Sequence, residues 1–297
     1  MTLPPLYKYL DIEGAKLTLQ NGNFKHAKPS DFNDLEDLTI RSIFPESDEA
    51  ALQEIKNNFT DVLLDNLDKA ATCINLQMRQ QITLIQEAYR KNPDVAKVIK
   101  EITKNDAVSE LYDLDRLRER SKGFVAEINN FMQDFRVLCV SQENNSKKMW
   151  ELYAQDSHGI VLRILPNVDK DSKFQLFRKV EYCASRPPLY KSALEFLANS
   201  LFGDQEKRAR EIIEDIVHSK TLKWEYEDEY RLAIPIRRGE DWNKLPYHSE
   251  EIPELYLGHK ASDEIKDEII KLAKRRNPEI KIFHACLAPD DRLLFLQ

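Results

Sequence analysis

The segment KTLKWEYEDEYRLAIPI, residues 220–236, holds the side chains of this chain best suited to acid–base chemistry. Four acidic residues fall within five consecutive positions, with aromatic residues such as Trp224 beside them. The alternation predicts a strand with Glu227, Glu229 and Arg231 on one face and mainly aromatic and aliphatic side chains on the other. In a cleft such carboxylates would raise one another's pKa, whereas in water they would hardly interact. Two interpretations stay open: a ligand-binding cleft, or a surface strand with solvated charges.

A second cluster, KKMWELYAQDSHGIVL, occupies residues 147–162. Trp150 and Tyr153 are three positions apart and would be neighbours on a short helix. They could stack on a ligand ring, or they could pack in the core, as aromatic residues at helical spacing usually do. His158 is a candidate acid or base because its ordinary pKa lies near neutrality.

A third cluster is the turn-rich sequence HAKPSDFNDLED, residues 26–37. Its Ser, Asp and Asn side chains favour turns by bonding to nearby backbone groups. Phe32 and Asn33 are therefore expected on an ordered loop. Such a loop can clamp a ligand or simply connect two elements.

Composition excludes several classes of protein. With 297 residues, of which 42% are apolar and 32% charged, the chain can bury a full core. A net charge of -7 does not support nucleic-acid binding, which depends on clustered Lys and Arg. The four cysteines lie far apart, so no zinc site is expected. Glu227 and Glu229 could serve two-metal cleavage, but no D-x-D or H-x-H companion sits on another strand, so no metal is predicted. Without a signal-like start or a long apolar run, the expected location is the cytoplasm, with no membrane partner.

The predicted elements indicate an α+β fold. Strands are expected at 6–10, 23–28, 135–141, 159–165, 177–183 and 220–236, and again in the C-terminal part. Residues 47–134 show helical periodicity instead and predict three or four amphipathic helices. We therefore expect a single α+β domain over 1–297, with a largely antiparallel mixed sheet and a helical insertion at 47–134. That insertion would act as a cap or bind a protein partner.

Taken in order, these pieces resemble the bacterial family known as domain of unknown function 2971. The matching motifs are LYKY, PSDFNDLE, CVS, MWELYAQDSHGIVL, VEY, KTLKWEYEDEYRL and LYLG. They extend over almost the whole chain, although Leu35 stands where the family usually has Pro. Membership of this family does not by itself imply a function.

The N-terminal run LYKYLDIEGAKLTLQNGNFKHAK also looks like the start of ADP-ribosyltransferase-type domains, including DNA-modifying toxins of the DarT kind. That resemblance implies an ADP-ribosyltransferase-like sheet and NAD as substrate. It implies Glu229 as the catalytic carboxylate and Glu227 as its helper. The binding residues expected from the clusters and this resemblance are Lys8, Tyr9, Phe32, Asn33, Ser141, Trp150, Tyr153, His158, Trp224 and Arg231.

The sequence therefore favours an NAD-using or nucleotide-processing enzyme, of the kind found among bacterial toxins and phage-defence effectors. A carboxylate close to the sugar would stabilise the oxocarbenium character that develops when the nicotinamide–ribose bond breaks. Two alternatives stay open. One is a non-catalytic nucleotide-sensing or protein-interaction module, and the other is a metal-dependent nuclease.

Overall fold

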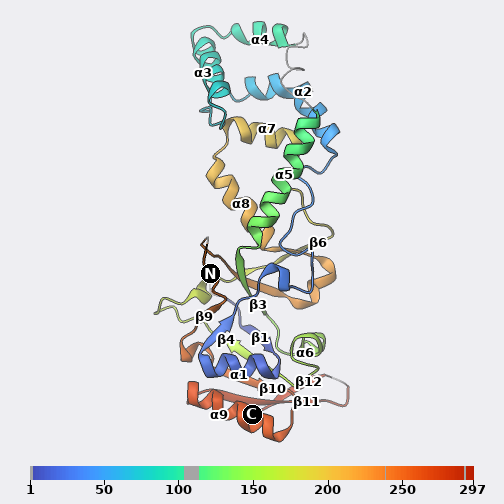
Figure 1. The fold of residues 1–297 in the computed structure, drawn as a ribbon, viewed down its shortest axis with the longest axis vertical. Helices are drawn as coiled ribbons and strands as arrows, with labels where there is room; N and C mark the ends of the chain where they lie inside the picture. The colour runs from blue at the N-terminus through green and yellow to red at the C-terminus, as the bar shows by residue number, and fades with distance from the viewer. Residues whose placement is uncertain (1–2, 104–113, 238, 291) are drawn as a thin grey trace. The chain divides into compact units, whose positions relative to one another are not determined.

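The computed structural model describes residues 3–103, 114–237, 239–290 and 292–297, and these fall into two compact units (Figure 1). The first unit contains the sheet and comprises Met1–Asp37, Met132–Ser185 and Val217–Gln297. The second is helical and comprises Leu38–Phe131 and Arg186–Ile216. The expected α+β class is confirmed, whereas an ADP-ribosyltransferase-like type of sheet stays a prediction.

One eight-stranded sheet forms the centre of the first unit, in the order β12-β11-β10-β4-β1-β3-β8-β5. Only β10 and β11 pair in parallel among its described strands, so the sheet is mixed and largely antiparallel, as expected. Its strands are β1 (Leu6–Leu10), β3 (Phe135–Ser141), β4 (Ile160–Ile164), β5 (Arg178–Lys179), β8 (Glu229–Pro235), β10 (Glu254–Leu257), β11 (Lys281–Leu287) and β12 (Leu293–Leu296). Two small sheets join β2 (Asn23–Lys25) to β9 (Lys244–Pro246) and β6 (Glu181–Cys183) to β7 (Ser219–Thr221).

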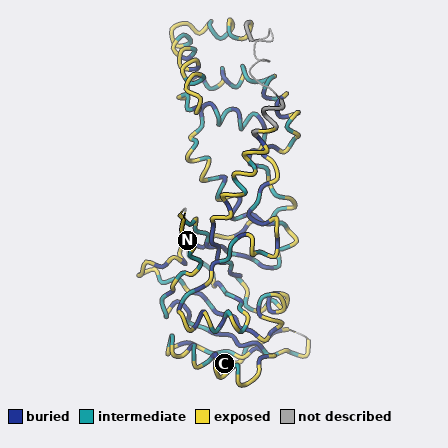
Figure 2. The backbone as a smooth tube through the Cα atoms, in the orientation of Figure 1, coloured by how far each residue is buried: buried dark blue, intermediate teal, exposed yellow. Residues whose placement is uncertain are grey.

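Helices cover both faces of this sheet. On one face α1 (Ile12–Asn21) and α9 (Asp263–Arg276) pack on a core that includes Leu6 and Leu162. On the other face α6 (Lys147–Tyr153) packs with Tyr9 and Val161. The inward and outward alternation of the central strands supplies both cores, and Figure 2 shows these strands as largely buried.

Local capping explains the first helix. Asp11 accepts a hydrogen bond from the Gly14 N–H and caps the start of α1. Gly22 ends the helix in the left-handed region at φ 64, and its N–H donates to the Thr18 carbonyl. Asp11 and Gly22 therefore define the two ends of α1.

The helical unit has its own buried contacts. Its helices are α2 (Asp48–Leu64), α3 (Leu76–Lys91), α4 (Val95–Thr103), α5 (Leu114–Met132), α7 (Ala193–Phe202) and α8 (Gln205–Val217). Helix α2 packs against α7, and the Thr72 N–H donates to the Leu201 carbonyl at 2.8 Å. Residues 186–216 thus complete the unit formed by the expected helical block, of which 104–113 lie outside the described residues. No helix in the described ranges is both long enough and apolar enough to span a membrane.

The prediction of one continuous strand over 220–236 is wrong. The segment forms β7, then the 3-10 helix η4 (Leu222–Glu227), and then β8 after Asp228, which is left-handed at φ 38. Because β7 and β8 belong to different sheets, the chain must change direction between them. The helical turn makes that change, so tertiary structure overrides the alternating pattern.

The predicted strand 177–183 is likewise divided. Its first part, β5, pairs with β8, and its second part, β6, pairs with β7. Between them, the Val180 N–H donates to the Glu229 carbonyl at 2.9 Å. The predicted strand at 23–28 is shorter than expected, because β2 ends at Lys25.

A buried histidine makes the stability of the sheet unit depend on pH. His26 is fully buried, its Nδ1 lies 3.1 Å from the Phe24 carbonyl oxygen, and burial lowers its pKa to about 4. Since the unfolded chain then binds the proton more tightly, this contribution to stability is complete above about pH 6.5 and falls as the pH drops towards 4.

Between about pH 7 and pH 5 the wild type should lose about 2 kcal/mol of unfolding free energy because of His26. In His26→Gln we expect this part of the loss to be absent. Urea unfolding of both proteins at the two pH values measures this. The control is His158→Gln, since His158 is exposed. An unchanged pH dependence in His26→Gln would contradict the assignment.

Candidate functional site

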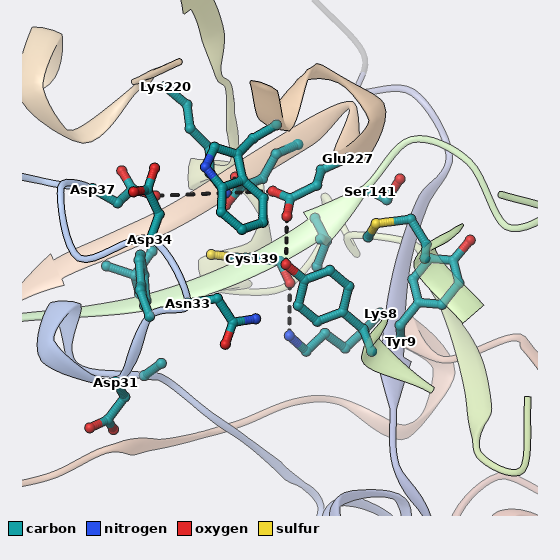
Figure 3. A pocket seen from close by; sticks show the side chains of 18 of the residues that line it. Lys8, Tyr9, Asp31, Asn33, Asp34, Asp37, Cys139, Ser141, Lys220 and Glu227 are labelled. Carbon is teal, nitrogen blue, oxygen red and sulfur yellow. Dashed lines mark hydrogen bonds and ion pairs between the residues drawn. The ribbon is translucent and has the colours of Figure 1, made fainter. Parts of the chain in front are cut away.

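A pocket of about 210 Å³ lies in the sheet unit beside β1 and β3 (Figure 3). In the described structure β1 pairs with β3 at one position, Tyr7 opposite Ser141. The next residues along β1, Lys8 and Tyr9, both line the pocket. Its other walls come from the loop 31–37, helix α6 and the segment 220–229. The N-terminal strand and the acid-rich segment therefore share one cavity.

Most of the residues selected from the sequence meet at this pocket. Those that line it are Lys8, Tyr9, Phe32, Asn33, Ser141, Tyr153, Trp224, Glu227 and Glu229. For residues 227–231, the interpretation as a surface strand with solvated charges is wrong, because Glu227, Glu229 and Arg231 are all buried.

Three selected residues lie outside the pocket lining. Trp150 is fully buried, and its ring packs edge-on against Tyr9, so it supports the pocket wall from behind. His158 is exposed on the loop after α6, with Nδ1 3.0 Å from the Gln155 carbonyl oxygen. Arg231 is fully buried, and its positive charge is paired with the Glu229 carboxylate.

Sequence reasoning missed Asp37 and Lys220, which are central to the site. Both are buried and line the pocket. Asp37 is the last residue of the turn-rich cluster and Lys220 the first of the acid-rich one. No periodicity links them, since they come together only when the loop 31–37 meets β7.

The Arg231 guanidinium connects these parts. Nε and Nη2 donate to the two oxygens of Glu229, at 2.8 and 3.1 Å. Nη1 donates to one Asp37 oxygen at 3.1 Å and to the Val217 carbonyl at 2.7 Å, and Nη2 donates to the other Asp37 oxygen. All five N–H donors of the side chain are thereby used. This arrangement joins the loop after β2 to strand β8.

Lys220 continues the network towards the pocket. Its ammonium donates to Glu229 at 2.9 Å and to Glu227 at 2.5 Å. The other Glu227 oxygen accepts from the Tyr153 hydroxyl at 2.5 Å, so the network reaches α6. Glu227 thus links Lys220 to Tyr153, and both of these residues line the pocket.

The two glutamates differ in their protonation chemistry. Burial by itself would raise the pKa of Glu229, but Arg231 and Lys220 outweigh it and hold that pKa well below its usual range. Burial and the neighbouring Glu229 charge raise the pKa of Glu227. Lys220, with its own pKa raised by both glutamates against burial, stays charged. One carboxylate is therefore fixed as an anion, and the other is easier to protonate.

Lys8 brings a further cation to the pocket. Its ammonium donates to the Cys139 carbonyl at 2.9 Å, and burial lowers its pKa. Burial also raises the pKa of the Cys139 thiol, which disfavours the reactive thiolate. Lys8 could therefore offer a charge or a hydrogen-bond donor to a ligand, and Cys139 forms part of the pocket wall.

Removing the buried guanidinium should destabilise the protein strongly. We expect Arg231→Met to lower the unfolding free energy by about 3–5 kcal/mol, because Asp37 and Glu229 are left buried without their partner. Arg178→Met is a matched control, since Arg178 lies opposite Arg231 on β5 but is exposed. Urea unfolding measures both variants. Equal, small losses would show that the bridge does not stabilise the fold.

Residues 149–232 match the model of a family described as "Protein of unknown function (DUF2971)". The matched range includes Tyr153, Lys220, Glu227 and Glu229, but it excludes β1 and the loop 31–37. No curated protein matches the chain, and no solved structure matches it. The match supports the resemblance to this family over residues 149–232, whereas the resemblance to ADP-ribosyltransferase-type domains stays a prediction.

Proposed function

We propose that the pocket binds NAD or a related nucleotide and cleaves the bond between its base and its ribose, as in ADP-ribosyltransferase-like enzymes. One observation supports this above the others: a buried carboxylate, Glu227, has a raised pKa and is hydrogen-bonded to Tyr153 in a pocket with aromatic walls. Perturbed titratable groups in a cleft are typical of catalytic sites.

Glu227, rather than Glu229, is the better candidate for the reacting carboxylate. Both oxygens of Glu229 are engaged by Arg231, and Lys220 adds a third donor. A carboxylate held in this way is a weak base. In this proposal Glu229 and Arg231 instead position Lys220, and Lys220 positions Glu227.

The chemistry follows from the charges that develop. As the C1′–N bond breaks, its electron pair leaves with the neutral nicotinamide, and positive charge appears on the ribose ring. The Glu227 carboxylate would stabilise that charge more than it stabilises the substrate. An attacking water would then lose its proton to Glu227, and the products would be nicotinamide and ADP-ribose.

The pocket suits one part of such a substrate. At about 210 Å³ it is smaller than the roughly 300–1,000 Å³ of pockets that enclose a whole drug-sized ligand. We therefore infer that it holds the base and its ribose, with the remainder of the nucleotide outside. Tyr9, Phe32 and Trp224 would position the ring and exclude water. Lys8 would contact a phosphate or ribose oxygen.

NAD consumption of this kind would suit a bacterial toxin or phage-defence effector in the cytoplasm, and the helical unit would then be available for a protein partner.

Glu227→Gln should reduce nicotinamide release from NAD by about a hundredfold or more, because it removes the charge that faces the ribose. The measurement is chromatographic detection of free nicotinamide. Glu225→Gln serves as the control, since Glu225 belongs to the same 3-10 helix but is exposed and does not line the pocket. Equal rates in wild type and Glu227→Gln would sink the assignment.

A second function, nucleotide sensing without turnover, is favoured by the position of Lys220. Its ammonium bonds to both glutamates and so reduces the negative charge available to a reacting sugar. If the protein is a sensor, NAD or a related nucleotide will bind without any nicotinamide release, and Glu227→Gln will weaken that binding. Isothermal titration calorimetry together with product analysis separates the two functions.

A further inference from the structure

Two polar atoms of pocket-lining residues have no hydrogen-bond partner among the described residues. One is Oδ2 of Asp34 and the other is the indole Nε1 of Trp224, and both atoms are buried. The Asp34 residue as a whole is only 5% exposed. A buried acceptor or donor without a partner is unfavourable, so a ligand that bonds to either atom would be stabilised there.

The Asp34 carboxylate is held in place through its other oxygen. Oδ1 accepts from the Glu36 N–H and pairs with the Lys223 ammonium, both at 3.3 Å. The Asp34 backbone carbonyl accepts from the Asp37 N–H at 3.0 Å, and Asp37 is fixed by Arg231. Oδ2 is therefore a preorganised acceptor; Figure 3 shows Asp34 beside Asp37.

The Trp224 ring is held on the same side of the pocket. The ammonium groups of Lys220 and Lys223 lie 5.0 and 5.5 Å from its ring centre. Lys223 contacts both the Asp34 carboxylate and the Trp224 ring, so the two residues lie around one lysine. A ligand that satisfies both atoms must present an N–H or O–H donor to Asp34 and an acceptor to Trp224.

We propose that Asp34 and Trp224 recognise an amide-type edge, in which an N–H donor stands beside an acceptor. The Asp34 oxygen would accept from the N–H, and the Trp224 N–H would donate to the neighbouring oxygen or ring nitrogen. The aromatic walls favour a flat group, and Asp34 repels a carboxylate in the same place. This inference rests on the proposed function, according to which the pocket binds NAD or a related nucleotide. Two parts of that ligand carry such an edge, the carboxamide of nicotinamide and the 6-amino edge of adenine.

The test compares the binding of three dinucleotides by equilibrium dialysis, with intact ligand measured by chromatography. The first is NAD, the second is its acid form with nicotinate in place of nicotinamide, and the third carries hypoxanthine in place of adenine. Wild type should bind NAD at least about tenfold more tightly than one of the two analogues, because a site built around a hydrogen bond rejects the wrong partner.

Asp34→Asn should reduce that preference about tenfold, since the new amide can donate to the analogue's oxygen. Trp224→Phe, which keeps a ring but loses the N–H, should weaken NAD binding. Glu225→Gln is the matched control and should leave the preference unchanged, because Glu225 does not line the pocket.

Discrimination against the acid form assigns the edge to nicotinamide, and discrimination against the hypoxanthine form assigns it to adenine. Equal binding of all three dinucleotides, or binding of none, overturns the inference. So does a wild-type preference that Asp34→Asn leaves intact. A binding preference without nicotinamide release would refute the proposed cleavage and support recognition by Asp34 and Trp224. Nicotinamide release without a binding preference would support the cleavage and refute the recognition.

Discussion

The arrangement of this site depends on one buried guanidinium between two carboxylates. Arg231 has no exposed surface, and Asp37 and Glu229 are almost as deeply buried. Charges so far from water are tolerated only when each has a partner in good geometry. The loop that carries Asp37 and the strand that carries Glu229 must therefore meet at the same place, and that meeting closes one side of the pocket.

Starting from Arg231, a series of hydrogen bonds with charged groups holds the other side chains of the site in place. Glu229 holds Lys220, Lys220 holds Glu227, and Glu227 holds the Tyr153 hydroxyl. Each step fixes one side chain against another that is already fixed, so little freedom remains for a ligand to remove. The position of a tyrosine on α6 is in this way determined by contacts that begin at Arg231.

The same network explains why neighbouring glutamates have different chemistry. Arg231 and Lys220 supply two positive charges, against three carboxylates in Asp37, Glu227 and Glu229. Glu229 bonds to both cations, whereas Glu227 bonds to Lys220 and to the neutral Tyr153 hydroxyl. Burial raises the pKa of Glu227, and the neighbouring Glu229 charge raises it further. A pair of like charges becomes one structural anion and one group suited to catalysis or binding.

Much of the local structure was predictable because it depends on nearby residues. Strands β1 and β3 follow from alternating and β-branched residues, and the helix after β1 follows from its Asp cap and the glycine at its end. The aromatic pair on α6 was correctly placed on a helix, but only the tertiary structure directed Tyr153 to the pocket and Trp150 to the core.

The sequence by itself determined the α+β class, the positions of most helices and strands, and the three clusters that supply the pocket. It could not determine that residues 222–227 turn as a helix, because that depends on β7 and β8 joining different sheets. Nor could it identify Asp37 and Lys220 as partners of the acidic pair. Charged side chains are buried only when distant parts of the chain bring their counter-charges together, and pairing of this kind leaves no periodic trace along the sequence.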